Sequence, residues 1–169
     1  PYLIIGNEFV KPGKGQAFNR IKMKNMISGR VVERTYKSGE KLDLADIEEH
    51  QMRFVYNDGD SAVFMDEKTY DQVTIGPEII GPIKHWLMEE TVYQVTFYKG
   101  RVIEVLPPTF LEMVITETSP GIRGDTSGRV LKPATTETGA KIQVPIFIEE
   151  GEKVKVDTRT GEYASRVNE

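Results

Sequence analysis

Alternating apolar and polar residues dominate this chain and predict β-strands. In segment 16–24, Phe18, Ile21 and Met23 lie near one face of an extended chain while basic residues interleave, as expected for a strand that buries one side. Other short runs rich in β-branched and aromatic residues follow at 52–56, 62–65, 92–98, 101–106, 110–117, 141–148 and 153–156. The pattern predicts many short strands spaced along the whole chain.

Turn residues separate these runs. Asn57-Asp58-Gly59, Lys99-Gly100, Glu150-Gly151 and Thr160-Gly161 predict hairpin turns, because glycine and asparagine accept the positive φ angles that tight turns require. Segments 66–73 and 83–90 are each predicted to form one or two helical turns. Many short strands with little helix indicate an all-β protein made of small β-barrels.

Charge divides the chain into three parts. Residues 1–45 carry a net charge of +5, residues 46–108 carry −7 and residues 109–169 carry −2. The sign changes after Ala45, and the consecutive Pro107 and Pro108 stop strand pairing, so we expect three domains at 1–45, 46–108 and 109–169. A basic first part on an acidic body suits a protein that places one end against phosphates, although scattered basic surface remains an alternative.

Composition excludes several classes of function. The chain has no cysteine, so disulfides, thiolate zinc sites and a cysteine nucleophile are ruled out. His50 and His85 are the only histidines, and neither has a second ligand at metal spacing. No apolar run approaches a membrane span, and no signal-peptide pattern is present, so we expect a cytoplasmic protein. No nucleophile, base and metal set is assembled, which predicts that the protein is not an enzyme.

The informative segment surrounds Lys14. Pro12 fixes its own φ angle, and Gly13 and Gly15 permit positive φ, so a tight turn should project the ammonium group of Lys14 into solvent. The phosphate-binding pattern G-x-x-x-x-G-K-[ST] is absent, and a strand follows the loop where that motif has a helix. From local chemistry alone, an ordinary solvated turn lysine remains the alternative.

The segment Lys11-Pro12-Gly13-Lys14-Gly15-Gln16 resembles the modification loop of the bacterial elongation factor P family. The similarity continues in order along the whole chain, through Arg34-Thr35-Tyr36-Lys37-Ser38-Gly39, Phe54-Val55-Tyr56-Asn57-Asp58-Gly59, Val105-Leu106-Pro107-Pro108, Gly124-Asp125-Thr126-Ser127-Gly128, Lys132-Pro133-Ala134-Thr135, Val144-Pro145-Ile146-Phe147-Ile148 and Val156-Asp157-Thr158-Arg159-Thr160-Gly161-Glu162-Tyr163. One Gly-Lys loop would be weak support, but this many ordered blocks make the resemblance strong.

The resemblance implies an SH3-like (KOW-like) first domain followed by two OB domains, in an L-shaped outline that imitates tRNA. It implies a monomeric translation factor that binds the 70S ribosome between the P and E sites and relieves stalling at consecutive prolines. A lysine-modifying enzyme would extend Lys14, by β-lysylation, so that it reaches the CCA end of the peptidyl-tRNA. Residues 11–16 would form the peptidyl-tRNA contact loop, and no metal or separate cofactor is implied.

A second contact implied by the resemblance is the loop of Gly124, Asp125, Thr126, Ser127 and Gly128. In the family this loop lies near the E-site mRNA codon, and its small polar residues suit a close approach of the backbone to RNA. A plain connection between strands is the alternative.

Two other functions stay open. One is the paralogous elongation-factor-P-like protein, which has different client sequences; the other is an OB-fold oligonucleotide-binding module without a role on the ribosome. Lys22, Lys24, Arg30 and Arg34 could contact tRNA phosphates or simply form a solvated strand face. Trp86 is expected in a core. Because family members usually begin earlier, the first strands of domain 1–45 are expected to be missing, which would leave an exposed edge.

Overall fold

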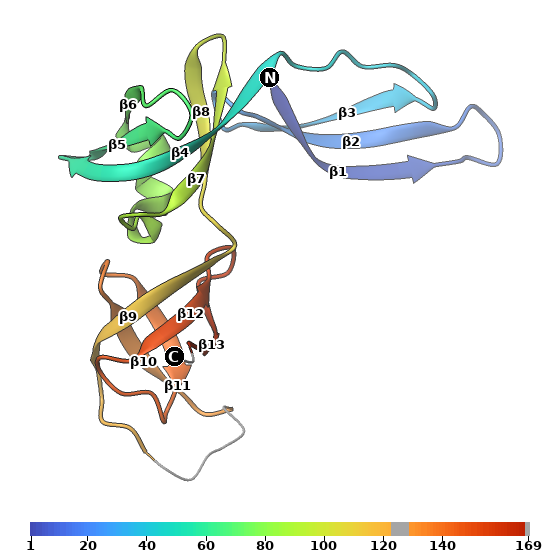
Figure 1. The fold of residues 1–169 in the computed structure, drawn as a ribbon. Helices are drawn as coiled ribbons and strands as arrows, with labels where there is room; N and C mark the ends of the chain where they lie inside the picture. Colours follow the sequence, from blue (N-terminus) through green and yellow to red (C-terminus); the bar gives the residue numbers. More distant parts are fainter. Residues whose placement is uncertain (123–128, 168–169) are drawn as a thin grey trace. The chain divides into compact units, whose positions relative to one another are not determined.

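Strands make up most of the fold. A computed structural model describes residues 1–122 and 129–167, and it contains three sheets of three, five and five strands (Figure 1). The described part of the chain has only short helical segments, namely α1 (Pro77–Ile80) and the 3-10 helix η1 (Gly81–Trp86). The predicted all-β class is confirmed.

The chain divides into two compact units. One comprises Pro1–His50 with Val95–Glu104, and the other comprises Gln51–Gln94 with Val105–Glu169. The second unit contains both short helices and the whole of the last sheet.

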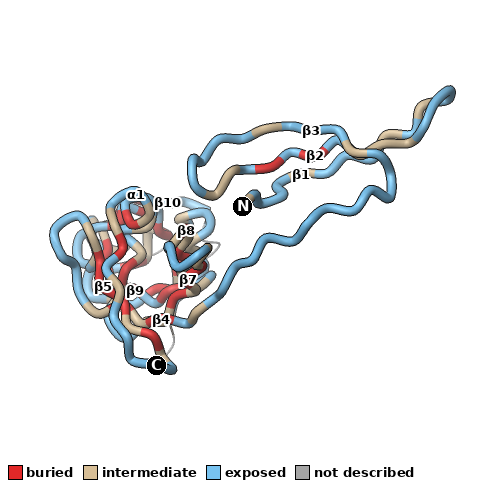
Figure 2. Tube along the Cα trace, turned by 90° about the horizontal axis from the view of Figure 1, so that it is seen from above, coloured by how far each residue is buried: buried red, intermediate tan, exposed pale blue. Residues whose placement is uncertain are grey.

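The first sheet contains β1 (Tyr2–Val10), β2 (Phe18–Asn25) and β3 (Val31–Lys37), paired antiparallel in the order β1-β2-β3. Its centre is β2, where Ile21 and Met23 are buried and their neighbours in the strand are more exposed. Figure 2 shows how little of this sheet is buried. The predicted alternation is present at Ile21 and Met23, although it supports only a thin layer. The prediction was wrong for Phe18, which is three positions from Ile21 in an unbroken strand and therefore lies on the opposite face.

The second sheet has the order β6-β5-β4-β7-β8. Its strands are β4 (Ile47–Asp58), β5 (Ser61–Asp66), β6 (Gln72–Ile75), β7 (Val92–Tyr98) and β8 (Arg101–Leu106). Phe64 packs edge-on against Phe54 and Tyr93, with ring centroids 5.7 and 5.5 Å apart. The Tyr93 hydroxyl accepts a hydrogen bond from the Met88 amide at 2.9 Å and donates one to the Trp86 carbonyl. This ring thereby ties β7 to the segment that follows η1.

The third sheet has the order β11-β10-β9-β12-β13. Its strands are β9 (Phe110–Thr118), β10 (Leu131–Thr136), β11 (Lys141–Pro145), β12 (Lys153–Asp157) and β13 (Glu162–Arg166). Its inward side chains form one apolar core, made of Leu111, Met113, Ile115, Ala134, Ile142, Val144, Ile148, Val154 and Val156. Trp86 and Met88 pack against this core from its edge, where Trp86 is half-buried, so the expectation of a core position holds only in part.

Several local predictions need correction. Segment 66–73 forms a turn and the start of β6, because Asp66 accepts the amides of Lys68 and Thr69 and so closes a turn where a helix was expected. The helical turns expected at 83–90 begin earlier, in α1 and η1, because Pro77 and Pro82 stand in the first turn of each.

The turn predictions hold at three of four places. Gly59, Gly100 and Gly161 have positive φ between the paired strands of a hairpin. Gly151 also has positive φ, but β11 and β12, which flank it, are not neighbours in the sheet, so no hairpin forms there.

Candidate functional site

The β1–β2 connection presents Lys14. Val10 and Phe18 form the last register pair of the two strands, so the residues between them make the loop. Figure 1 shows this connection extending past the strand ends. Lys11 and the residues from Gly13 to Gln16 are exposed, and Pro12 is half-buried. The structure therefore brings all six predicted loop residues into one hairpin tip with the Lys14 side chain in solvent.

Gly15 makes this tip possible. Its φ angle is +121°, a region that residues with a Cβ rarely adopt. A Cβ built there would lie 3.6 Å from Pro12 Cγ, an ordinary contact, so backbone conformation and not space selects glycine. Gly13 has no positive φ, and an added Cβ would meet nothing within 4 Å. Of the two glycines beside Lys14, only Gly15 is required by geometry.

Contacts below the tip hold its base. The Asn19 side-chain amide donates to Asn7 Oδ1 at 3.0 Å across β1 and β2. After β3, the Ser38 amide donates to the Ala17 carbonyl at 3.1 Å, which attaches the end of the loop to the neighbouring strand. The base of the loop is thus connected to all three strands, while Lys14 at its tip is exposed.

The strand register separates the basic residues of this sheet. Lys22 and Lys24 alternate along β2 with the buried Ile21 and Met23, so both lysines lie on the opposite face. Arg34 is the register partner of Ile21 and lies on the apolar face. Arg34 stacks over the ring of Tyr2, 5.4 Å from its centroid.

Arg20 shares the face of Lys22 and pairs with two carboxylates. Its guanidinium lies 3.5 Å from Glu8 and 3.6 Å from Glu33. All three side chains are substantially exposed, so these pairs contribute little stability. Lys22 lies opposite Glu33 in the register, and Lys24 interacts electrostatically with Glu104, so each basic residue on this face has a carboxylate nearby. Lys22 and Lys24 are exposed and remain candidates for phosphate contacts.

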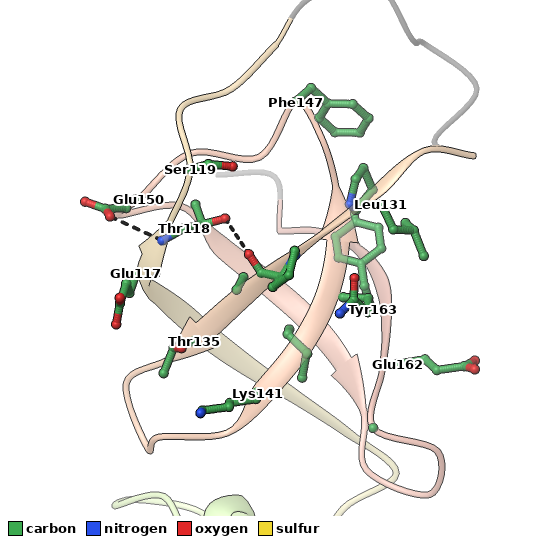
Figure 3. A pocket seen from close by; sticks show the side chains of 16 residues that line it. Glu117, Thr118, Ser119, Leu131, Thr135, Lys141, Phe147, Glu150, Glu162 and Tyr163 are labelled. Atoms are coloured by element: carbon green, nitrogen blue, oxygen red, sulfur yellow. Dashed lines mark hydrogen bonds between the residues drawn. The ribbon is translucent and has the colours of Figure 1, made fainter.

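The second predicted loop, Gly124 to Gly128, lies outside the described residues. Its flanking segments are described, and they leave β9 at Ser119 and enter β10 at Leu131. Close to this connection, the outer face of β10 and β11 forms an open groove in the C-terminal sheet (Figure 3).

The groove has a mixed lining. Glu117, Glu150 and Glu162 contribute three carboxylates, against one ammonium from Lys141. Figure 3 shows Phe147, Leu131 and Tyr163 near one another at one side. The strand 2–3 face of OB domains commonly binds oligonucleotides, but a lining with excess negative charge repels phosphates. The electrostatics thus disfavour the oligonucleotide-binding alternative for this face.

No metal site is evident in the described part of the chain. Residues 1–122 and 129–167 contain no group of three His, Asp or Glu side chains placed to hold a metal ion. His85 lies next to Thr138. The Thr138 hydroxyl donates a hydrogen bond to the His85 carbonyl at 2.6 Å. Within the same residues, no helix has the length and apolar character needed to cross a membrane.

Sequence reasoning missed one unusual residue, Lys132. It is only 6% exposed, and its Nζ donates to the carbonyl of Ser119. A signal was available, because alternation along β10 places Lys132 on the same face as Ala134 and Thr136, which are also buried. Reading segment 131–136 as a strand would have placed a lysine among core positions.

Three family models match the chain with little overlap or gap. They are described as the elongation factor P (EF-P) KOW-like domain, matching residues 1–42, the elongation factor P (EF-P) OB domain, matching 47–105, and elongation factor P, C-terminal, matching 111–166. Together they support one KOW-like domain followed by further small β domains.

Similar proteins extend over almost the whole chain. A protein of Protochlamydia amoebophila named elongation factor P 2 is 66% identical over 169 residues, covering 99% of this chain and 89% of that protein. A protein of the same name from Chlamydia trachomatis is 61% identical over the same shares. A solved structure of translation initiation factor 5A from Methanococcus jannaschii aligns with a TM-score of 0.46 and 23% identity, over 62% of this chain and 80% of that chain.

Proposed function

The chain belongs to the elongation factor P family, and from that premise we propose that it acts on the ribosome through Lys14. The observation that carries the proposal is the hairpin tip, where a glycine in a left-handed conformation turns the chain and leaves Lys14 exposed. An exposed primary amine on a short arm is accessible to a modifying enzyme and can later enter a narrow site.

Lys14 is the proposed modification site, by β-lysylation, and Lys11 is not. Lys11 follows the last residue of β1, whereas Lys14 lies between Gly13 and Gly15 in the middle of the loop. A modified Lys14 would be longer and carry additional positive charge, so it reaches further from the strand ends than the bare side chain.

The proposed action is positioning. The factor binds between the P and E sites, and modified Lys14 orders the CCA end of a peptidyl-tRNA whose nascent chain ends in prolines. Proline is a slow substrate because its ring constrains the amine and the backbone around it. Ordering the donor end raises the rate of peptide-bond formation without proton transfer by the factor. Reactants that are already aligned lose less entropy on the way to the transition state.

The basic face of the first sheet supports this orientation. Lys22 and Lys24 lie on β2, the strand that follows the loop, and present two ammonium groups to solvent. Phosphate contacts fix the register and orientation of a protein on nucleic acid without reading its sequence. We assign these two lysines to the tRNA backbone. The loop of residues 124–128 is assigned to the E-site codon.

Two measurements test the proposal. Peptide mass spectrometry of protein from its native host should find the added mass on Lys14 and none on Lys11. Purified factor should then shorten ribosome pausing at a Pro-Pro-Pro sequence and leave a proline-poor message unchanged. An unmodified Lys14 together with a modified Lys11 contradicts the site, and equal pausing with and without the factor contradicts the function.

A further inference from the structure

The groove of the C-terminal sheet is large enough to hold a segment of polypeptide. It is lined by residues of β9, β10, β11 and β13, and its volume is about 1390 Å³. Pockets that bind small molecules commonly enclose about 300–1,000 Å³. We call this feature the acidic groove, after the carboxylates of Glu117, Glu150 and Glu162 that line it.

The exposed charge of the acidic groove is net negative. Glu117, Glu150 and Glu162 are all exposed, and among the described lining residues Lys141 supplies the opposing ammonium group. Lys132 also lies on β10, but it is buried and bonds within the fold. In Figure 3, Glu117 and Glu150 lie at one side of the groove and Glu162 at the other. Carboxylates on both sides attract a cationic partner and repel a phosphate backbone.

Apolar surface lies beside these carboxylates. Leu131 is 50% exposed, and the rings of Phe147 and Tyr163, near it in Figure 3, are half-buried. Aromatic rings that are apolar on one side and reach solvent on the other are common at protein interfaces. The groove can therefore bury apolar side chains of a partner as well as pair with its charges.

One corner of the groove already holds a cation. The guanidinium of Arg166 stacks over the Phe147 ring, 4.9 Å from its centroid, and pairs with the carboxylate of Glu152. An aromatic face next to a carboxylate favours lysine and arginine side chains. A partner cation placed beside Tyr163 and Glu162 would repeat this arrangement.

The strand order favours an extended partner. In the order β11-β10-β9-β12-β13, the outermost strands are β11 and β13, and both line the groove. The outer edge of such a strand can pair with the backbone of an extended peptide, whose alternate side chains then face the same surface.

We propose that the acidic groove binds an extended basic segment of a partner protein. Lysine or arginine side chains of that segment pair with Glu117, Glu150 and Glu162, and apolar side chains between them lie against Leu131, Phe147 and Tyr163. This inference goes beyond the proposed function, whose nucleic-acid contacts involve other residues, and it stands or falls separately from the role of Lys14.

The probe is a fluorescein-labelled peptide of sequence Lys-Thr-Leu-Thr-Lys-Thr-Leu-Thr-Lys. In an extended conformation it places lysine and leucine on one face and threonine on the other. Fluorescence anisotropy with the full chain should show saturable binding that weakens as salt is added. The same peptide with glutamate at every lysine position should not bind.

The double variant Glu117→Gln with Glu162→Gln should raise the Kd for the lysine peptide by about fivefold, because two exposed charge pairs are lost. The matched control is Glu89→Gln with Glu112→Gln. These two residues are also exposed but lie outside the lining of the groove, so the control should leave the Kd within about twofold of wild type.

Lys141→Gln provides a test that loss of folding cannot imitate. Removing this opposing ammonium group should lower the Kd for the lysine peptide by about twofold. If the Glu117→Gln, Glu162→Gln protein does not fold, the direction of the Lys141→Gln effect decides the proposal alone. A single-stranded RNA of similar length is the competing probe, and Lys141→Gln should not weaken any RNA binding that is observed.

Four outcomes would overturn the proposal. The first is no binding of the lysine peptide at about 1 mM, a concentration that reveals even weak sites. The second is an equal loss in the groove variant and the control, which would place the peptide elsewhere on the acidic surface. The third is tighter binding of the lysine peptide when Lys141 is retained than in Lys141→Gln. The fourth is RNA binding that Lys141→Gln weakens, which would assign the face to nucleic acid.

Discussion

The first and third sheets differ sharply in how much they bury. The β1–β2–β3 sheet has two buried apolar residues, Ile21 and Met23. The C-terminal sheet closes over nine. Fully burying a side chain of this size contributes about 1.5–3 kcal/mol, so the C-terminal domain has far more packing energy to lose. The first sheet therefore rests on a much smaller apolar core than the C-terminal sheet.

The difference predicts where substitutions act. Changes at the Lys14 tip should alter activity with little effect on stability, because nothing packs on the side chain. Changes near the C-terminal core should alter stability first.

The largest loss of stability is expected for Met113→Ala. Met113 is fully buried at the centre of β9, within the C-terminal core, and removing a buried side chain of this size costs about 2–5 kcal/mol. Urea unfolding followed by fluorescence of Trp86, which packs on that core, measures it. Glu112→Ala, on the exposed face of the same strand, is the control and should stay within about 0.5 kcal/mol. A loss below 1 kcal/mol for Met113→Ala would contradict the assigned core.

Tyr93→Phe should cost about 1–3 kcal/mol at neutral pH, because the Met88 amide and the Trp86 carbonyl lose their hydroxyl partner. Burial raises the pKa of Tyr93 from 10.0 to about 12. The folded protein therefore keeps the phenol proton where the unfolded chain loses it. The contribution of the protonated Tyr93 to the free energy of unfolding is complete below pH 10. It is lost as the pH rises from 10 towards 12, and the loss is at most about 2.7 kcal/mol.

The measurement is the free energy of unfolding between pH 9 and 12 for wild type and Tyr93→Phe. The gap between the two proteins should narrow as the pH rises. A gap that stays constant would contradict the assigned pKa direction.

Ile21→Ala tests the thin sheet. Ile21 is 8% exposed, and its truncation should cost about 2 kcal/mol or less, at the low end for buried isoleucine, because few neighbours surround the cavity. Hydrogen exchange should accelerate in β1, β2 and β3 and stay unchanged in β9 to β13. Equal acceleration in both sheets would show that the two regions unfold together.

Gly15→Ala should lower the free energy of unfolding by about 1 kcal/mol, a smaller loss. Alanine at φ +121° is disfavoured, although the added Cβ has space. Gly13→Ala is the matched control, and its open surroundings predict no more than about 0.5 kcal/mol. Thermal unfolding of the two variants gives the difference. Equal costs would contradict the turn geometry assigned to the tip.

The sequence was most informative where periodicity was strong. Segments 92–98 and 101–106 were predicted with the bounds that β7 and β8 have, because β-branched residues recur in both strands and aromatic residues also occur in β7. No range was predicted for β1, and the strands β3, β6, β10 and β13 were missed. In β10 the core face carries Lys132 and Thr136, so apolar alternation is broken by residues whose burial depends on tertiary partners.

The candidate site also has parts that local sequence predicts and parts that depend on tertiary structure. The hairpin tip around Lys14 could be located from the turn-forming residues Pro12, Gly13 and Gly15, although the backbone conformation requires a glycine only at Gly15. The split of Lys22 and Arg34 onto opposite faces needed the strand register, which depends on how β2 pairs with β3. The buried bond from Lys132 to Ser119 joins residues thirteen positions apart and follows from no local rule.

Lys14→Ala tests the central claim most directly. The variant should unfold within about 0.5 kcal/mol of wild type, because an exposed tip lysine buries little. Lys11→Ala, in the same loop, is the matched control for charge. At matched ribosome occupancy, wild type and Lys11→Ala should shorten pausing at Pro-Pro-Pro, whereas Lys14→Ala should not, and a proline-poor message should be unaffected by all three. Equal rescue by wild type and Lys14→Ala would contradict the account.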